Sequence, residues 1–375
     1  MAETSLPGAL AGIRVIDLSR VLGGPYCGQI LGDHGAEVLK IEPPQGDDTR
    51  AWGPPFQDGV ASYYLGLNRN KLGSRLDLTT PAGREVLLGL LEGADVLIEN
   101  FKTGTLEKWG LDHAVLAKRF PRLVHCRVSG FGADGPLGGL AGYDAAVQAL
   151  SGIMSVNGEA DGQPLRVGLP VVDLVTGLNA ALGVMMALHE RARSGKGQFV
   201  EASLFDSALS LLHPHAANWF LDAKQPVRTG NAHPNIYPYD AFPTRTAPVF
   251  LAVGNDRQFS ILGRHLGTGW ADDSRFANAR GRSVHREALR GLIVETLASQ
   301  DGPALAQALM ALGVPCAPIL TVDAALQHPH TAHREMVVRI GDYTGVASPI
   351  KLGRTPATYR HAPPIRLDGA EQDAG

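Results

Sequence analysis

Residues 12–42 most constrain the fold, because they predict two strands joined by one helix. The pattern gives an apolar strand at 12–18 (GIRVIDL), a glycine-rich turn at 19–25, a helix at 26–34 and a second strand at 36–42 (AEVLKIE). Strands connected in this way pair in parallel with a right-handed crossover. Strands and helices continue to alternate after this unit, so we expect an α/β fold with a parallel sheet.

The turn at 19–25 is a candidate ligand-binding loop. Gly23 and Gly24 precede a helix, and Glu42 ends the second strand, as in many nucleotide-binding folds. The G-x-G-x-x-G spacing of dinucleotide-binding proteins is absent. Open α/β sheets bind ligands at the carboxyl ends of their strands, so we expect the functional site at that edge of the sheet.

A long helix with a single carboxylate at its start is predicted within residues 166–206. Apolar residues recur at spacings of three and four from Leu174 to Leu188, and a strand is predicted at 198–204. Asp173 stands at the beginning of this helix. It is either an N-cap that accepts a backbone N–H, or a nucleophile that the helix end keeps ionised at neutral pH. The segment alone leaves both interpretations open.

The composition argues against several classes of function. The 34 basic and 37 acidic residues give a net charge of −3, which disfavours nucleic acid or an anionic membrane as a partner. Neither the 13 histidines nor Cys27, Cys126 and Cys316 show metal-ligand spacing. We find no signal peptide and no apolar run long enough to span a bilayer, so we expect a soluble protein of a reducing cytoplasm.

The character of the sequence changes after Phe220, which predicts a second domain. A loop rich in polar, aromatic and proline residues (GNAHPNIYPY) begins at Gly230, and shorter strand and helix patterns follow. We expect a large Rossmann-like domain formed by residues 1–220 and 326–375. A smaller inserted α/β domain would span residues 221–325.

Eight segments follow one another in an order that is specific as a set. They are LSRVLGGP (18–25), GAEVLKIE (35–42), NRNKLGSRLDL (68–78), ADVLIENFKTGTLEKWGL (94–111), GYDAAVQALSG (142–152), LPVVDLVTGLNAALGVMMAL (169–188), GKGQFVEASLFDSAL (195–209) and GNAHPNIYPYDAF (230–242). With these segments the chain resembles the class III CoA-transferases, a family that includes formyl-CoA and carnitine CoA-transferases and the 2-methylacyl-CoA racemases. The resemblance implies a Rossmann-like large domain and an interlocked homodimer.

The family's nucleophilic aspartate falls on Asp173. The resemblance implies that this carboxylate attacks an acyl-CoA and that CoA then reaches a free carboxylic acid through aspartyl anhydride and aspartyl-CoA thioester intermediates. No permanent cofactor is implied, because coenzyme A enters as part of the substrate. The glycine-rich loops at 130–135 and 230–231 are candidate donors to the developing oxyanions, or ordinary turns.

The family's CoA contacts carry over to several positions. Val21, Asn100, Phe101 and Lys108 match in sequence, and Arg69, Lys71 and Arg75 lie in a matching segment. These last three basic residues form either a phosphate clamp or a solvated edge strand. Pro43, Leu22 and Ser129 replace residues of the formyl-CoA enzyme, which argues against oxalate and formate as substrates.

The GNAHPNIYPY loop most resembles family members that act on C4 and C5 dicarboxylates, with succinyl-CoA as the donor. Arg20, Tyr143, Asn231 and His233 are therefore candidate substrate-binding residues, and His233 is alternatively a loop-capping histidine. Arg50 and Arg166 are further candidates for binding a second carboxylate, because a guanidinium matches it bidentately.

Two other functions remain open at this stage. The racemase branch carries a histidine in a GHD motif, where this chain has Gly142-Tyr143-Asp144, and a tyrosine with an ordinary pKa near 10 is a poor acid/base partner. A non-catalytic CoA-binding protein would leave the thioester intact. The sequence favours transfer over both alternatives.

Overall fold

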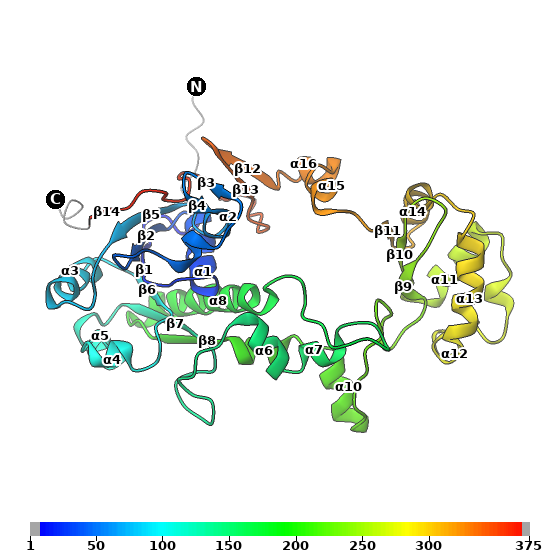
Figure 1. Ribbon diagram of the computed structural model, residues 1–375, viewed down its shortest axis with the longest axis horizontal. Helices are drawn as coiled ribbons and strands as arrows, with labels where there is room; N and C mark the ends of the chain where they lie inside the picture. The colour runs from blue at the N-terminus through cyan, green and yellow to red at the C-terminus, as the bar shows by residue number, and fades with distance from the viewer. Residues whose placement is uncertain (1–7, 370–375) are drawn as a thin grey trace. The chain divides into compact units, whose positions relative to one another are not determined.

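The computed structural model describes residues 8–369, and its largest feature is a parallel sheet (Figure 1). Neighbouring strands follow the order β14-β5-β2-β1-β6-β7-β8, and every pair in it is parallel. The predicted α/β class is thus confirmed. The strands are β1 (Arg14–Asp17), β2 (Glu37–Glu42), β5 (Lys71–Arg75), β6 (Val96–Glu99), β7 (Val124–Ser129), β8 (Phe199–Ser203) and β14 (Asp368–Gly369).

The strand order reverses between β1 and β6. From β1 the chain moves outward through β2 to β5, and it then returns to the other side of β1 for β6, β7 and β8. This is the doubly wound order of the Rossmann fold. Ligands bind in such sheets where the direction changes, because the loops after the two central strands diverge there and leave a crevice.

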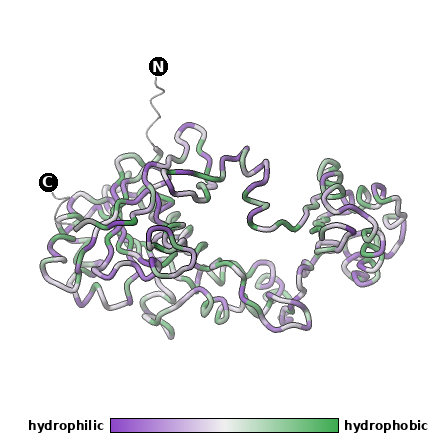
Figure 2. Tube along the Cα trace, turned by 45° about the horizontal axis from the view of Figure 1, so that its top comes forward, coloured by the Kyte–Doolittle hydropathy of each residue, from purple (hydrophilic) through white to green (hydrophobic). Residues whose placement is uncertain are grey.

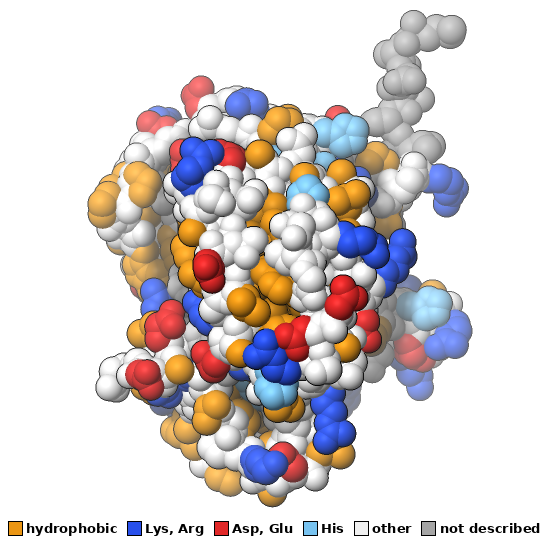
Figure 3. All heavy atoms as spheres, turned by 90° about the vertical axis from the view of Figure 1, so that its right-hand side faces the viewer, with side chains coloured by type: hydrophobic (Ala, Val, Ile, Leu, Met, Phe, Trp, Pro, Cys, Tyr) orange, Lys and Arg blue, Asp and Glu red, His pale blue; other side chains and the backbone are white. Residues whose placement is uncertain are grey.

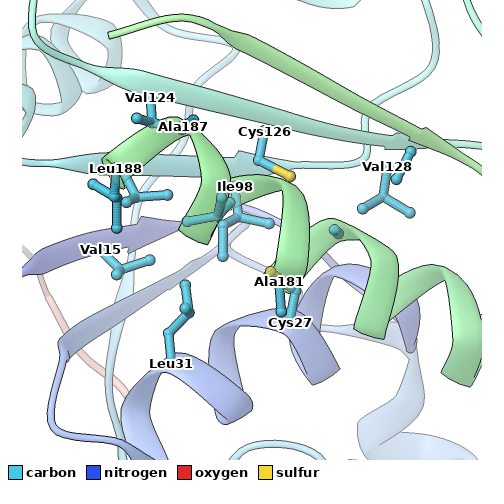
Figure 4. Close-up of a cluster of buried hydrophobic side chains, with 14 of the residues drawn as sticks. Val15, Cys27, Leu31, Ile98, Val124, Cys126, Val128, Ala181, Ala187 and Leu188 are labelled. Atoms are coloured by element: carbon cyan, nitrogen blue, oxygen red, sulfur yellow. The ribbon is translucent and has the colours of Figure 1, made fainter. Parts of the chain in front are cut away.

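Alternate residues of the strands face two different layers. Val15, Val96 and Ile98 belong to the core shared with α1 (Gly23–Asp33) and α8 (Val171–Ser194), where Leu31 and Ala181 lie (Figure 4). Ile16 and Leu97, each one position along, belong to a second core on the other face. That core includes leucines of α3 (Pro81–Leu91), α4 (Thr105–Lys108) and α5 (His113–Arg119).

Helix α8 corrects one expectation from the sequence. It is long and apolar enough to cross a membrane by length and composition, although we predicted no such run. In the large unit it is a core helix instead: Val172, Ala180 and Val184 are fully buried in the core that α1 and the sheet share. Gly195 ends it in the left-handed conformation with φ of 75°.

The chain divides into two compact units. The first comprises residues 1–153, 166–221 and 329–375, and the second comprises residues 154–165 and 222–328. The second unit therefore also takes in residues 154–165, which we had assigned to the large domain. In the first unit the chain returns after residue 329 through the hairpin β12 (Val337–Ile340) and β13 (Tyr343–Val346) to β14.

The second unit has its own sheet and its own core. The antiparallel strands β9 (Tyr239–Phe242), β10 (Val249–Ala252) and β11 (Cys316–Pro318) are covered by α11 (Asp256–His265), α13 (Arg286–Leu297) and α14 (Gly302–Ala311). Apolar and polar residues alternate along the chain in both units (Figure 2), as two separate cores require. One face of the molecule (Figure 3) mixes acidic, basic and apolar side chains.

Short elements complete the fold. They are η1 (Asp48–Ala51), β3 (Phe56–Gln57), β4 (Val60–Ala61), α2 (Ser62–Leu65), α6 (Asp144–Leu150), α7 (Ile153–Val156), α9 (Leu204–Ser210), α10 (His215–Asp222), η2 (Trp270–Asp272), α12 (Ala279–Val284), α15 (Val322–Leu326) and α16 (Pro329–His333).

Candidate active site

The loops after β1 and β6 are tied together at the point where the strand order reverses. Asn100 follows β6 directly, and its side-chain oxygen accepts from the backbone N–H of Arg20 at 2.9 Å. Its amide nitrogen donates to the carbonyl oxygen of the same residue at 2.7 Å. Asn100 therefore fixes the backbone of the loop after β1 from both sides.

Val21 adopts a strained backbone in this loop. Its φ of 71° lies in the left-handed region, which a β-branched residue rarely enters. Its N–H points to the carboxylate of Asp47, whose oxygens lie 3.3 and 3.4 Å away. Asp47 forms a fully buried ion pair with Lys40 at 3.1 Å. The surrounding structure thus holds this conformation in place, as is common at functional sites.

A cavity of about 260 Å³ opens at this edge of the sheet. The loops 20–23, 100–103, 128–130 and 139–143 line it, together with Asp48, Leu204 and Asp173. Six of the residues predicted from the sequence therefore surround one cavity: Arg20, Val21, Asn100, Phe101, Tyr143 and Asp173.

A second cavity of about 290 Å³ lies at the carboxyl ends of β1, β2, β5 and β6. Phe101 and Trp109, in edge-to-face contact with 5.4 Å between ring centroids, form part of its wall. Arg20, Phe101 and Lys102 line both cavities. The sequence analysis missed Lys102, although it directly follows Phe101 in a segment that matched the family.

Asp173 lies in the first turn of α8, but it does not cap the helix. The N-cap position belongs to Pro170, and no side chain at that position makes a capping hydrogen bond. Asp144 of α6 accepts from the N–H of Val172 at 2.8 Å and from that of Asp173 at 3.2 Å. The N-cap interpretation of Asp173 is therefore wrong, because another carboxylate occupies the N–H groups that it would use.

The electrostatic surroundings of Asp173 also differ from our expectation. Burial, followed by the nearby charge of Asp144, raises the pKa of Asp173 to about 7. One interpretation of the sequence was that the helix end keeps Asp173 ionised at neutral pH. A pKa of about 7 contradicts full ionisation there. Tyr63 of α2 belongs to the same neighbourhood, since burial and the charges of Asp173 and Asp144 raise its pKa to about 12.

Two glycines bring α1 and α8 together beside Asp173. A Cβ atom on Gly177 would lie 2.7 Å from the carbonyl oxygen of Gly23, closer than real Cβ contacts allow. A Cβ atom on Gly23 would lie 3.4 Å from the carbonyl oxygen of Asp173. Gly177 thus permits the start of α1 to lie against the first turns of α8.

The predicted phosphate clamp is not supported by the placement of its residues. Lys71 is buried and donates to Asp17 at 2.8 Å, and Arg69 is buried and donates to Asp33 at 2.6 Å. Both have structural partners inside the large unit and line neither cavity. Arg50 likewise forms an ion pair with Glu42 at 2.7 Å.

The remaining candidates lie outside the two cavities. Arg75 and Lys108 are exposed next to residues that line the second cavity, and Arg166 is exposed and donates to the carbonyl of Val167 at 3.1 Å. Asn231 and His233 belong to the second unit. The ring Nδ1 of His233 accepts from the N–H of Asn235 at 3.0 Å, which supports its interpretation as a loop-capping histidine.

Asp144 is a functional candidate that sequence reasoning overlooked. The triplet that contains it was examined only for the absent histidine. Within residues 8–369 no group of three or more His, Cys, Asp or Glu side chains is placed to hold a metal ion. The site thus consists of the partly buried carboxylate of Asp173, the carboxylate of Asp144 at the same helix end and the glycine-rich loops that line the cavity.

A doubly wound sheet with such a carboxylate at its switch point defines an α/β enzyme that can carry out acyl transfer. A sequence model of CoA-transferase family III matches residues 10–368. The chain belongs to this family and is a CoA-transferase.

Relatives with known names and structures cover nearly the whole chain. The succinate–glutarate CoA-transferase of Agrobacterium fabrum is 41% identical over 368 residues, which cover 95% of this chain and 92% of that protein. The succinyl-CoA:mesaconate CoA-transferase of Haloarcula marismortui is 35% identical and covers 98% of both chains. The crystal structure of a CAIB/BAIF family protein from Brucella suis is similar with a TM-score of 0.86 at 40% identity, covering 96% of this chain and 97% of that one.

The raised pKa of Asp173 predicts how stability depends on pH. Its folded-state pKa of about 7 exceeds the ordinary value of 3.8, so the folded protein binds more protons than the unfolded chain between these pH values. Stability from this group therefore falls as pH rises from about 4 to 7. Asp173→Asn lacks this loss of stability. We expect its free energy of unfolding to exceed that of the wild type by roughly 1–3 kcal/mol above pH 7.

Urea unfolding at pH 5, 6, 7 and 8 measures this difference. Asp112→Asn is the matched control, because Asp112 caps α5 by accepting from the N–H of Val115 at 3.1 Å, and asparagine caps equally well. A stability difference between Asp173→Asn and wild type that does not grow with pH would contradict the raised pKa of Asp173 in the folded protein.

Proposed function

We propose that this enzyme transfers CoA from succinyl-CoA, or a similar acyl-CoA, to a free C4 or C5 dicarboxylate. The observation that carries the mechanism is the carboxylate of Asp173, which lines the cavity at the switch point and makes no capping bond to its own helix. The choice of acids is supported by relatives whose names specify succinate, glutarate and mesaconate.

The proposed reaction proceeds through covalent intermediates on Asp173. Its carboxylate oxygen attacks the thioester carbonyl and the C–S bond breaks. CoA departs as the thiolate, and an acyl-aspartyl anhydride is formed. The thiolate then attacks the aspartyl carbonyl and releases the donor acid as a carboxylate. The acceptor carboxylate attacks the resulting thioester, and the thiolate takes the new acyl group from the second anhydride, which regenerates Asp173.

The environment of Asp173 suits this sequence of steps. With a pKa of about 7 it is more basic than an ordinary carboxylate, and its ionised fraction at neutral pH is a correspondingly stronger nucleophile. Gly130 and Gly142 line the same cavity and are proposed to bring backbone N–H groups near the developing oxyanions. Arg20 and Tyr143 are proposed to bind the substrate carboxylate there. Asn231 and His233 stay substrate-binding predictions that rest on the resemblance of their loop.

Covalent capture on Asp173 tests the proposal. We expect wild-type protein incubated with succinyl-CoA and hydroxylamine to gain a hydroxamate on the peptide that contains Asp173, detected by mass spectrometry. Asp173→Asn should give no adduct and lose at least about a thousandfold in transfer rate, whereas Asp112→Asn should match wild type.

A panel of labelled acceptor acids separates the alternatives. Dicarboxylates of four and five carbons should accept CoA faster than monocarboxylates of the same length. Exchange of the α-proton of 2-methylacyl-CoA without an acceptor would instead indicate a racemase, and binding of CoA with neither reaction would indicate a non-catalytic protein.

We propose that the nucleotide end of CoA occupies the second cavity. Its aromatic and apolar wall suits a flat adenine ring, and it lies at the nucleotide position of the doubly wound fold. Lys102 lines both cavities, which supports the proposal that its ammonium group neutralises a phosphate of CoA between them. Val21, Asn100 and Phe101 would contact the remainder of CoA, with Arg75 and Lys108 beside the outer phosphates.

Lys102 provides the test of this placement. We expect Lys102→Ala to raise the KM for acyl-CoA roughly 3- to 10-fold, the effect of losing about 1 kcal/mol from one accessible charge-assisted contact, with little change in kcat. Lys118→Ala, which removes an exposed lysine of α5, is the control. Equal KM values for the two variants would contradict the assignment of the second cavity.

We further propose that the enzyme works in the cytoplasm as a homodimer. Helix α10 exposes Trp219, Phe220 and Leu221, the last with 89% of its surface accessible, and α8 exposes Leu182 and Met186. Apolar surfaces of this kind mark protein interfaces. Light scattering should give twice the mass of one chain, and Phe220→Ser should shift the protein toward monomer. A purely monomeric wild type would refute the dimer.

A further inference from the structure

Two side chains one turn apart on α6 hold the segment that leads into α8. Gln148 accepts from the N–H of Val167 at 2.8 Å, and its amide nitrogen donates to the carboxylate of Asp144. The other oxygen of that carboxylate accepts from the N–H groups of Val172 and Asp173. Both side chains are buried, with Asp144 8% and Gln148 0% exposed.

This arrangement decides what the carboxylate of Asp173 can contact. An aspartate in the first turn of a helix ordinarily turns back toward the unpaired N–H groups of that turn. Here Asp144 already accepts from two of those groups, including the N–H of Asp173 itself. The carboxylate of Asp173 consequently remains on the wall of the cavity, clear of its own backbone.

We propose that Asp144, held by Gln148, is a positioning residue for CoA transfer: it occupies the start of α8 and thereby keeps the carboxylate of Asp173 directed at the bound thioester. This role rests on the proposed nucleophilic function of Asp173. Asp144 in this role orients the carboxylate of Asp173 and does not itself contact the reacting atoms.

The charge of Asp144 adds a second effect. Because the two carboxylates share one helix end, ionising Asp173 places a second negative charge beside the first, and its pKa rises. The titratable and charged groups that face Asp173 or share its cavity are Asp144, Tyr143, Tyr63, Arg20, Asp48 and Lys102. Among these groups, Asp144 accepts directly from the backbone N–H of Asp173.

Two substitutions separate the two effects. Asp144→Asn keeps an oxygen that accepts from the helix N–H groups, but it removes the charge and the oxygen that accepts from the amide of Gln148. Asp144→Ala removes both the acceptor and the charge. Asp112→Asn and Asp112→Ala are matched controls, because Asp112 also caps a helix but lines neither cavity.

The rate of hydroxamate formation on Asp173 from succinyl-CoA, measured from pH 4.5 to 8.5, is the decisive readout. In wild type the rate should rise with pH through about 7, because the ionised carboxylate is the nucleophile. In Asp144→Asn the rise should move to lower pH by about one unit or more. Asp144→Ala should lower the limiting rate roughly 10- to 100-fold with the KM for succinyl-CoA within about twofold of wild type.

The outcomes distinguish this inference from the proposed function. No adduct in wild type at any pH would remove the nucleophile and with it this role of Asp144. An adduct in wild type whose rate rises near pH 4 would overturn the charge effect of Asp144, because Asp173 would then titrate like an ordinary carboxylate. Asp144→Ala that is folded by circular dichroism, yet matches Asp112→Ala in limiting rate, would overturn the positioning role.

Discussion

The unpaired N–H groups at the start of α8 are the constraint on which the active site depends. Every helix begins with such groups, and they must find acceptors. In this enzyme the acceptor is Asp144, which belongs to a different helix. The conformation of Asp173, the proposed nucleophile, is thus set by how α6 packs against α8, and it cannot be understood from α8 alone. The close approach of Gly23 to Gly177 then brings the loop after β1 up to the same helix end.

Buried ion pairs lie next to the loop after β1, outside the two cavities. Lys71 pairs with Asp17 under α1, and Lys40 pairs with Asp47, which in turn receives the N–H of Val21. Removing one partner of such a pair leaves an uncompensated charge in the core, so each pair constrains its strand end strongly. The left-handed backbone of Val21 persists because this network and Asn100 hold the loop on both sides.

The features that raise the pKa of Asp173 also work against the stability of the fold. A carboxylate that is largely buried beside another carboxylate is disfavoured when ionised, and the large unit must compensate for it through the core around α8. That core is formed by apolar residues of α1, α8 and alternate positions of the strands. Part of the apolar character of α8, which by composition resembles a membrane span, follows from this position, whereas Leu182 and Met186 of the same helix are exposed.

The sequence by itself determined the parallel sheet, the long helix after Asp173 and the family, because periodicity and local motifs are properties of neighbouring residues. It also located Arg20, Val21, Asn100, Phe101 and Tyr143, which surround one cavity. It could not assign Arg69 and Lys71, because their partners Asp33 and Asp17 lie 36 and 54 residues away. Only the tertiary structure decided that Asp144 caps α8 and that Asp173 has a pKa of about 7. Hydrogen bonding between helices, burial and the approach of like charges arise only when distant segments are packed together.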